Sequence, residues 1–118
     1  MDKKLQKIID ELWLLKYRNL RAYDVAEGGV SKFLVVATAI GTTENKKSAL
    51  ELASKIKYEQ KIDGIHKGEW IIFDLDEIVL QLFASGFRER YNIDKLYKGR
   101  EIQFTKTEKK SQNKKNKV

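Results

Sequence analysis

The chain has 118 residues, a formal net charge of +7, 42% hydrophobic and 35% charged residues, and no cysteine. This length predicts a single domain with one core. The lack of cysteine excludes disulfides, thiolate catalysis and cysteine-based zinc sites. No apolar run approaches the ~20 residues that a membrane span needs. The first residues, MDKKLQKIID, carry charges where a signal peptide has its apolar stretch. We therefore expect a cytoplasmic protein without a membrane partner.

The positive charge is concentrated at the C-terminus. Residues 98–118 contain eight Lys or Arg against two Glu, whereas the residues before them are almost neutral. A nucleic-acid-binding domain usually spreads its basic side chains over a folded face. This stretch has few apolar residues after Phe104, which is typical of disorder. We therefore predict a folded domain over residues 1–99 and a basic, disordered tail over residues 100–118.

The first quarter of the chain predicts a helix and then a strand. Apolar residues recur at helical spacing along residues 3–17, and Asp2 is the expected N-cap. The apolar face consists of Leu5, Ile8, Ile9, Leu12 and Trp13. Residues 21–25 predict a short strand, which ends at the turn signal Glu27-Gly28-Gly29.

The middle of the chain predicts a buried strand and a second helix. Residues 33–38 are apolar and rich in β-branched side chains without alternation, which is typical of a strand buried on both faces. After Gly41, Thr42 or Thr43 is expected to cap a helix. The apolar stripe of that helix is Ala49, Leu52, Ala53 and Ile56. Residues 62–66 predict a weak strand.

The strongest strand signals lie at residues 70–73 and 78–83. The link between them is short, so the two strands are expected to form an antiparallel hairpin. Residues 85–91, capped by Ser85, and residues 94–97 predict two short helical segments. This order of elements indicates an α/β or α+β fold, with a small mixed sheet flanked by helices.

The turn between the two strands, Asp74-Leu75-Asp76-Glu77, is open to two interpretations. Paired carboxylates can hold a divalent metal, as in a metal-dependent nucleotidyltransferase that would use Asp74 and Asp76. Such an enzyme also has a Gly-Ser loop shortly ahead of the pair and a carboxylate on a later strand. Gly41-Thr42 lies a whole helix and a strand upstream, and residues 78–82 contain no carboxylate. We prefer the alternative, in which acidic residues favour an exposed turn.

No other motif indicates catalysis or metal binding. His66 is the single histidine, and one His without Cys does not make a zinc site. A catalytic triad would need a nucleophile that the sequence does not identify. The glycines do not form a phosphate-binding loop. We therefore predict a protein that is not an enzyme and has no cofactor or metal.

Two features could contact a partner. In a strand, Trp70 shares one face with Ile72, whereas Phe73 shares the opposite face with Ile71. If helices cover only one face, Trp70 could anchor a partner, since Trp buries a large area at low entropy cost. The basic tail could be a solubilising segment, or it could bind RNA phosphates without sequence preference.

The C-terminal third resembles the signature of the ribosomal silencing factor family, also called the Iojap-like family. The two matching stretches are GEWIIFDLDEIVLQLF and RERYNIDKLY, and the residues that match directly are Trp70, Asp74, Leu75, Ile78, Phe83, Lys95 and Leu96. Residues 32–39 also resemble a strand of the family, and the resemblance covers about residues 3–99. Asp76-Glu77 replaces a Gly-Asp of the family, Gln81 replaces a His, and residues 38–44 lack the Gly, Ser and His of the family's segment.

The resemblance implies a partner and a site. Family members bind ribosomal protein L14 (uL14) of the large subunit and block joining of the small subunit when nutrients are short. They have a nucleotidyltransferase-like fold without a catalytic site, and they commonly form homodimers. The contact residues that we expect are Trp70, Asp74, Leu75, Asp76, Glu77, Tyr91 and Lys95. Trp70 and Leu75 would be the apolar part, and the acidic turn would be a rim facing a basic protein.

Two alternative functions stay open from the sequence. One is the metal-dependent nucleotidyltransferase that would use Asp74 and Asp76. The other is an RNA-binding ribosome-assembly factor, which would contact ribosomal RNA through the basic tail.

Overall fold

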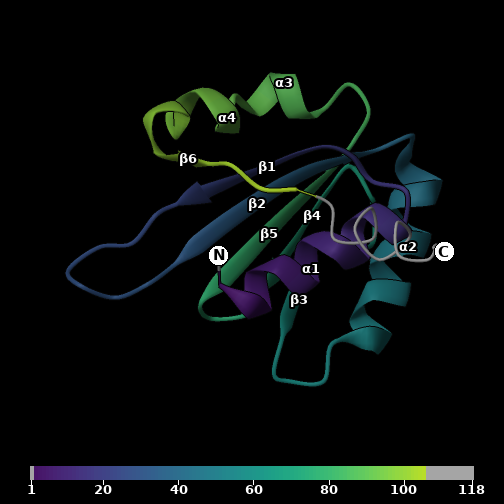
Figure 1. Ribbon diagram of the computed structural model, residues 1–118. Coiled ribbons are helices and arrows are strands. Elements are labelled where there is room, and N and C mark those ends of the chain that lie inside the picture. The colour runs from purple at the N-terminus through teal and green to yellow at the C-terminus, as the bar shows by residue number, and fades with distance from the viewer. Residues whose placement is uncertain (1, 106–118) are drawn as a thin grey trace, which may run out of the picture.

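The computed structural model describes residues 2–105, which fold into one six-stranded mixed sheet with helices (Figure 1). The strand order is β3-β4-β5-β2-β1-β6. β2 and β5 are parallel, and all other neighbouring strands are antiparallel. The elements are α1 (Lys3–Leu14), β1 (Arg18–Asp24), β2 (Phe33–Ala39), α2 (Thr42–Lys55), β3 (Lys61–Asp63), β4 (Trp70–Asp74), β5 (Ile78–Ala84), α3 (Arg88–Tyr91), α4 (Ile93–Leu96), the 3-10 helix η1 (Lys98–Arg100) and β6 (Glu101–Ile102). The predicted fold class is confirmed.

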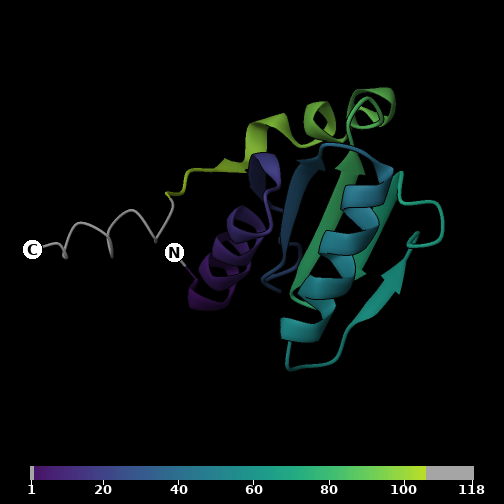
Figure 2. The ribbon, with the colours of Figure 1, turned by 90° about the vertical axis from the view of Figure 1, so that its right-hand side faces the viewer.

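Helices α1 and α2 lie side by side on one face of the sheet (Figure 2). The predicted N-cap of α1 is confirmed, because Asp2 Oδ1 accepts a hydrogen bond from the Leu5 amide at 3.0 Å. The helix ends at Leu14, three residues before the predicted end. It stops there because Lys16 adopts a left-handed backbone with φ of 71°.

The main core lies between these helices and the sheet. It contains the predicted apolar face of α1 apart from the partly buried Trp13, together with Ala49 and Leu52 of α2 and the side chains of Ile71 and Phe73. Each fully buried Leu, Ile or Phe side chain stabilises the folded state by about 1.5–3 kcal/mol relative to an exposed one. β2 is buried along both faces, as its unbroken apolar run predicted.

Helix α2 begins differently from the prediction. Gly41 is its N-cap, and neither Thr42 nor Thr43 caps it. The first turn instead buries a polar side chain, Asn45, which is completely inaccessible to solvent. Sequence periodicity had assigned only apolar residues to this face.

Asn45 is the centre of a buried hydrogen-bond cluster. Its Oδ1 accepts a hydrogen bond from the Tyr17 hydroxyl at 2.7 Å, and its Nδ2 donates to the carbonyls of Gly68 and Leu82, each at 2.9 Å. The amide therefore connects the chain after α1, helix α2, the loop before β4 and strand β5. Such a cluster stabilises only when every buried polar atom has a partner.

The predicted hairpin is confirmed, with Trp70 opposite Phe83 and Asp74 opposite Val79. The predicted alternation is also present. Ile71 and Phe73 are fully buried beneath the helices, whereas Trp70 lies on the opposite face.

The predicted helix over residues 85–91 is shorter than expected. Only one turn, α3, forms after Phe87, and Ser85 does not cap it. Asn92 then adopts a left-handed φ of 54°, which separates α3 from α4. Both short helices cross the end of the sheet (Figure 1).

The described fold continues past residue 99, where we expected the disordered tail to begin. Strand β6 pairs with β1 through Ile102 opposite Ala22, and Phe104 packs against the main core. The Thr105 carbonyl accepts a hydrogen bond from the Gln6 side chain at 2.9 Å. Residues 100–105 therefore belong to the fold, and the predicted tail residues 106–118 lie outside the described residues.

Candidate partner-binding surface

The face of the sheet opposite α1 and α2 is covered only in part. Beneath α3 and α4, a second, smaller core contains four buried residues: Tyr23, Leu34, Val36 and Phe83. Beside it, Trp70, Ile72, Val79 and Gln81 are half-buried on strands β4 and β5. We call these four residues the open strip. Among residues 2–105, no helix longer than one turn packs on this face.

Two predicted contact residues meet at one end of the open strip. The rings of Trp70 and Tyr91 have centroids 4.3 Å apart, and the Trp70 ring also stacks on Phe83 at 5.2 Å. The Trp70 indole Nε1 donates to Gln81 Oε1 at 3.0 Å. Tyr91 remains 42% exposed. The indole is therefore held in one orientation beside an exposed aromatic side chain, as is typical of an interface anchor.

The acidic turn lies at the other end of β4. Trp70 and Asp74 are four positions apart, which in a strand is about 13 Å. Two of the turn's three carboxylates also have partners: Asp74 Oδ1 accepts from the Asp76 amide at 3.0 Å, and Glu77 lies 3.5 Å from the Lys4 ammonium. The turn therefore does not form a rim immediately around Trp70.

Leu75 and Lys95 also lie apart from Trp70. Leu75 is 2% exposed and belongs to the main core, so the expectation of an exposed apolar anchor at this position is wrong. It continues the alternation of Ile71 and Phe73 toward the helices. Lys95 is exposed, but it lines a concavity near β1, with Arg21 and Lys98.

The structure does not bring together the glycine loop and the carboxylate pair that a nucleotidyltransferase site needs. Gly41 follows the end of β2, and β2 runs parallel to β5. Asp74 and Asp76 precede the start of β5, so Gly41 and this pair lie at opposite ends of the sheet, separated by about 20 Å. Within residues 2–105, no group of three His, Cys, Asp or Glu side chains could hold a metal ion.

A buried arginine holds the α3–α4 segment against the sheet. Arg88 is 7% exposed, and it donates from Nε to Asp94 Oδ2 at 2.7 Å and from Nη2 to Asp94 Oδ1 at 2.9 Å. Its Nη1 donates to Thr38 Oγ1 at 2.9 Å and to the Asn19 carbonyl. This bidentate geometry fixes the position of α4 relative to β1 and β2. Sequence reasoning missed Arg88, whose only signal was an Arg and an Asp within RERYNIDKLY.

The carboxylate of Asp94 is shared by two donors. The Tyr23 hydroxyl donates to Oδ1 at 2.6 Å, in addition to the two bonds from Arg88. Partial burial raises the pKa of Asp94, but the hydrogen bonds from Arg88 and Tyr23 lower it by more, so its pKa lies below the ordinary value. Burial, followed by the hydrogen bond to Asp94, raises the pKa of Tyr23. Asp94 is therefore charged and Tyr23 neutral near pH 7.

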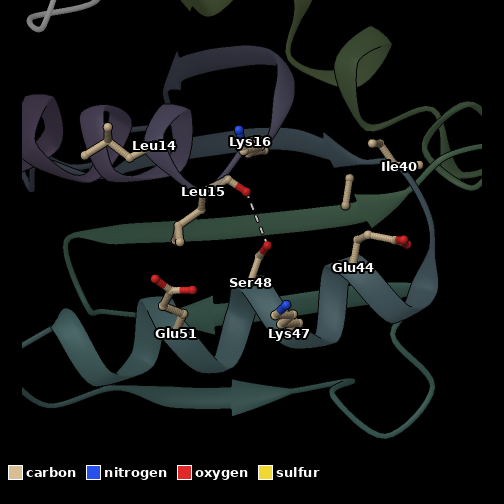
Figure 3. A pocket seen from close by; sticks show the side chains of 9 residues that line it. Leu14, Leu15, Lys16, Ile40, Glu44, Lys47, Ser48 and Glu51 are labelled. Carbon is tan, nitrogen blue, oxygen red and sulfur yellow. Dashed lines mark hydrogen bonds between the residues drawn. The ribbon is translucent and has the colours of Figure 1, made fainter.

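A separate groove lies on the helix-covered side of the sheet, between the end of α1 and helix α2 (Figure 3). Its volume is about 300 Å³, and Ser48 Oγ donates across it to the Leu15 carbonyl at 3.2 Å. Leu14 and Ile40 on its edges are 60% and 62% exposed. Its charged residues, two acidic and two basic, are Lys16, Glu44, Lys47 and Glu51. The groove shares no residue with the open strip.

These observations define a small mixed α/β domain with one partly open sheet face. A family model described as "Ribosomal silencing factor during starvation" matches residues 2–118. The chain therefore belongs to this family of ribosomal silencing factors, and the resemblance found in the sequence is confirmed. The match includes residues 100–118, which lie beyond the stretch of about residues 3–99 that carries the resemblance.

Individual relatives are distant. The ribosomal silencing factor RsfS of Zymomonas mobilis is 25% identical over 75 residues, which cover 60% of this chain and 56% of that protein. The chain thus matches little more than half the length of this relative. A crystal structure from Bacillus halodurans has a TM-score of 0.72 at 17% identity and covers 87% of this chain and 100% of its own. One from Chromobacterium violaceum has a TM-score of 0.71 at 20% identity, with 89% and 93% covered. These two similarities establish the fold.

No helix within residues 2–105 has the length and apolar character needed to cross a membrane.

Proposed function

We propose that the protein binds ribosomal protein L14 of the large subunit and prevents the small subunit from joining, so that translation is repressed when nutrients are short. Membership of the ribosomal silencing factor family supports this function. The structural observation that carries the proposal is the open strip, with the pair of Trp70 and Tyr91 at its end. Such a blocker acts by occupying a surface, so it needs an anchor and a rim rather than catalytic groups.

The proposed contact is narrower than the one expected from the sequence. It retains Trp70 and Tyr91 as aromatic anchors and adds Ile72 and Val79, whose side chains share the open face. Gln81 orients the Trp70 ring through the 3.0 Å hydrogen bond. Leu75 is excluded because the main core buries it.

The acidic turn has a different place in the proposal. Asp74, Asp76 and Glu77 are exposed at the far end of β4. Ribosomal proteins are generally basic, and exposed charges that do not touch the anchors mainly steer association. We therefore propose that the turn mainly affects the rate at which the protein associates with L14.

The aromatic anchor can be tested without removing a core residue. Tyr91→Ala truncates a side chain that is 42% exposed, and Tyr58→Ala is a matched control, because Tyr58 is 37% exposed and lies between α2 and β3. Loss of an aromatic anchor typically costs about 1–2 kcal/mol, so the L14 dissociation constant should rise roughly tenfold. The control should keep the affinity of the unmodified protein.

The blocking step has its own measurement. Separated large and small subunits are mixed with the protein and resolved on a sucrose gradient. The unmodified protein should lower the fraction of joined ribosomes, and Tyr91→Ala should lower it less. A protein that binds neither L14 nor the large subunit would refute the proposed function.

From the family resemblance we also propose a cytoplasmic protein that forms a homodimer. Sedimentation equilibrium across a range of protein concentrations tests the dimer, and a constant monomer mass would rule it out.

A further inference from the structure

The concavity beside Lys95 lies at the edge of the sheet, away from the open strip. Its volume is about 600 Å³. The residues that line it come from β1, α3, α4, η1 and β6, and they are Asn19, Arg21, Tyr23, Arg88, Glu89, Asp94, Lys95, Lys98 and Glu101. Lys95 and Lys98 are exposed, and neither forms an ion pair within residues 2–105.

Two of the three acidic residues in this concavity are already paired. Arg88 binds Asp94 at 2.7 Å, and Arg21 binds Glu101 at 2.7 Å. Glu89 forms no ion pair within the described part of the chain. The two free lysines therefore exceed the single free carboxylate, and the surface of the concavity is positive.

The chain stays basic beyond the concavity. From residue 95 to 105 the basic residues are Lys95, Lys98 and Arg100, and the only carboxylate is Glu101, which Arg21 neutralises. In the sequence, residues 106–118 contain six lysines and one glutamate. A stretch with this many basic residues matches an extended polyanion better than it matches a single anion.

We propose that the edge formed by Lys95, Lys98 and Arg21 binds the phosphate backbone of RNA. Exposed lysines neutralise phosphates and release counterions without reading sequence. Arg21 has guanidinium donors left beyond the one that binds Glu101. The ligand is thus an RNA backbone rather than a base sequence. The proposal deepens the proposed function, because a protein docked on L14 would have ribosomal RNA as its neighbour.

The test uses the full chain and a short fluorescein-labelled RNA hairpin, with fluorescence anisotropy measured between about 50 and 200 mM salt. The variant is Lys95→Gln combined with Lys98→Gln. The control is Lys47→Gln combined with Lys57→Gln, which removes two exposed lysines from the α2 side. Each lost phosphate contact should reduce the slope of log affinity against log salt by about 0.7–0.9. We therefore expect a reduction of about 1.4–1.8 in the variant and little change in the control.

A second variant should act in the opposite direction. Glu101→Gln removes the carboxylate that occupies Arg21, so RNA affinity should rise and the salt slope should become steeper by about one phosphate. The proposal would be overturned if the variant with Lys95→Gln and Lys98→Gln had the same salt slope as the control. It would also be overturned if the full chain did not bind RNA at the lowest salt. Polyglutamate competing as well as RNA of equal charge would overturn it too, since the ligand would then be an acidic protein.

The outcome separates this proposal from the proposed function. L14 binding is measured with Lys98→Gln alone, because Lys95 was among the L14 contacts expected from the family resemblance, and it should be unchanged. If L14 binding is absent while lysine-dependent RNA binding persists, only the proposed function fails. If L14 binding is present but the lysine variants bind RNA normally, only the RNA-binding edge fails.

Discussion

The ion pair between Arg88 and Asp94 offers a quantitative prediction, because the molecule contains a second ion pair of the same length. Arg88–Asp94 and Arg21–Glu101 both have an N–O distance of 2.7 Å. They differ in burial. The Arg88 side chain is 9% exposed, whereas the Arg21 side chain is 55% exposed. The two pairs therefore share a bond length, but Arg88 is more buried than Arg21 and binds its carboxylate through two hydrogen bonds rather than one.

Asp94→Asn keeps the shape of the side chain and removes its charge. Arg88 would then remain a buried cation without a counterion, which typically costs 3–5 kcal/mol. The Asp94 side chain is 36% exposed, so water would offset part of the loss, and we expect about 2–3 kcal/mol. For a domain of this size the melting temperature should fall by roughly 8–12 °C. Glu101→Gln should cost less than about 1 kcal/mol, as is usual for an exposed pair.

Thermal and urea unfolding, followed by far-UV circular dichroism, measure both variants. Tryptophan emission, measured in a Trp13→Phe background so that only Trp70 emits, gives an independent readout, because undocking of α3 would separate Tyr91 from the indole. We expect a larger spectral change for Asp94→Asn than for Glu101→Gln. Equal destabilisation by the two substitutions would refute the argument that burial of Arg88 makes the first pair important.

Acid should remove the contribution of Asp94 to the free energy of unfolding. Its pKa is lower in the folded protein than in the unfolded chain, so the pair contributes its full stability above the unfolded pKa of about 4. That contribution is lost as the pH falls through the lower, folded pKa. The difference in unfolding free energy between the unmodified protein and Asp94→Asn should therefore shrink below about pH 4. A difference that is constant from pH 7 to strong acid would contradict this.

Two further substitutions test local features of the fold. Asp76 has a φ of 74°, so Asp76→Gly should stabilise the protein by about 0.5–1 kcal/mol in urea unfolding, while Glu77→Gly, at a residue without positive φ, should destabilise it. Tyr17→Phe leaves the buried Oδ1 of Asn45 without its donor and should cost about 1–3 kcal/mol, whereas the exposed Tyr58→Phe should change the melting temperature little.

The hairpin and the helix-covered core could be predicted because period-two and helical patterns report burial directly. The same alternation that places Ile71 and Phe73 under the helices also places Leu75 there. Treating residues 74–77 as a uniform exposed turn therefore hid the burial of Leu75. The position of Asn45, four residues before Ala49 on the buried stripe, was likewise available from periodicity. The burial of Asn45 was nevertheless not predicted, because its side chain is polar and only the fold supplies the carbonyls that accept hydrogen bonds from its amide.

The buried position of Arg88 could not be predicted from the sequence for a related reason. A charged side chain is normally exposed, and its burial here depends on acceptors from two distant segments of the chain as well as on the nearby Asp94. Asp76 is a different case. The family resemblance places a glycine there, and the left-handed φ explains why a glycine suits that turn. Asp is tolerated because the Asp74 side chain accepts a hydrogen bond from its amide.

The hydrogen bonds of Arg88 connect the fold to the proposed L14 contact. By holding α4 against β1 and β2, they also hold the preceding turn, α3, where Tyr91 covers Trp70. The aromatic anchor is therefore set by a buried polar network rather than by the hairpin alone. The acidic turn at the other end of β4 is independent of this network. Substitutions near Arg88 should consequently change the dissociation rate of a bound partner, and substitutions in the acidic turn should change the association rate and its salt dependence.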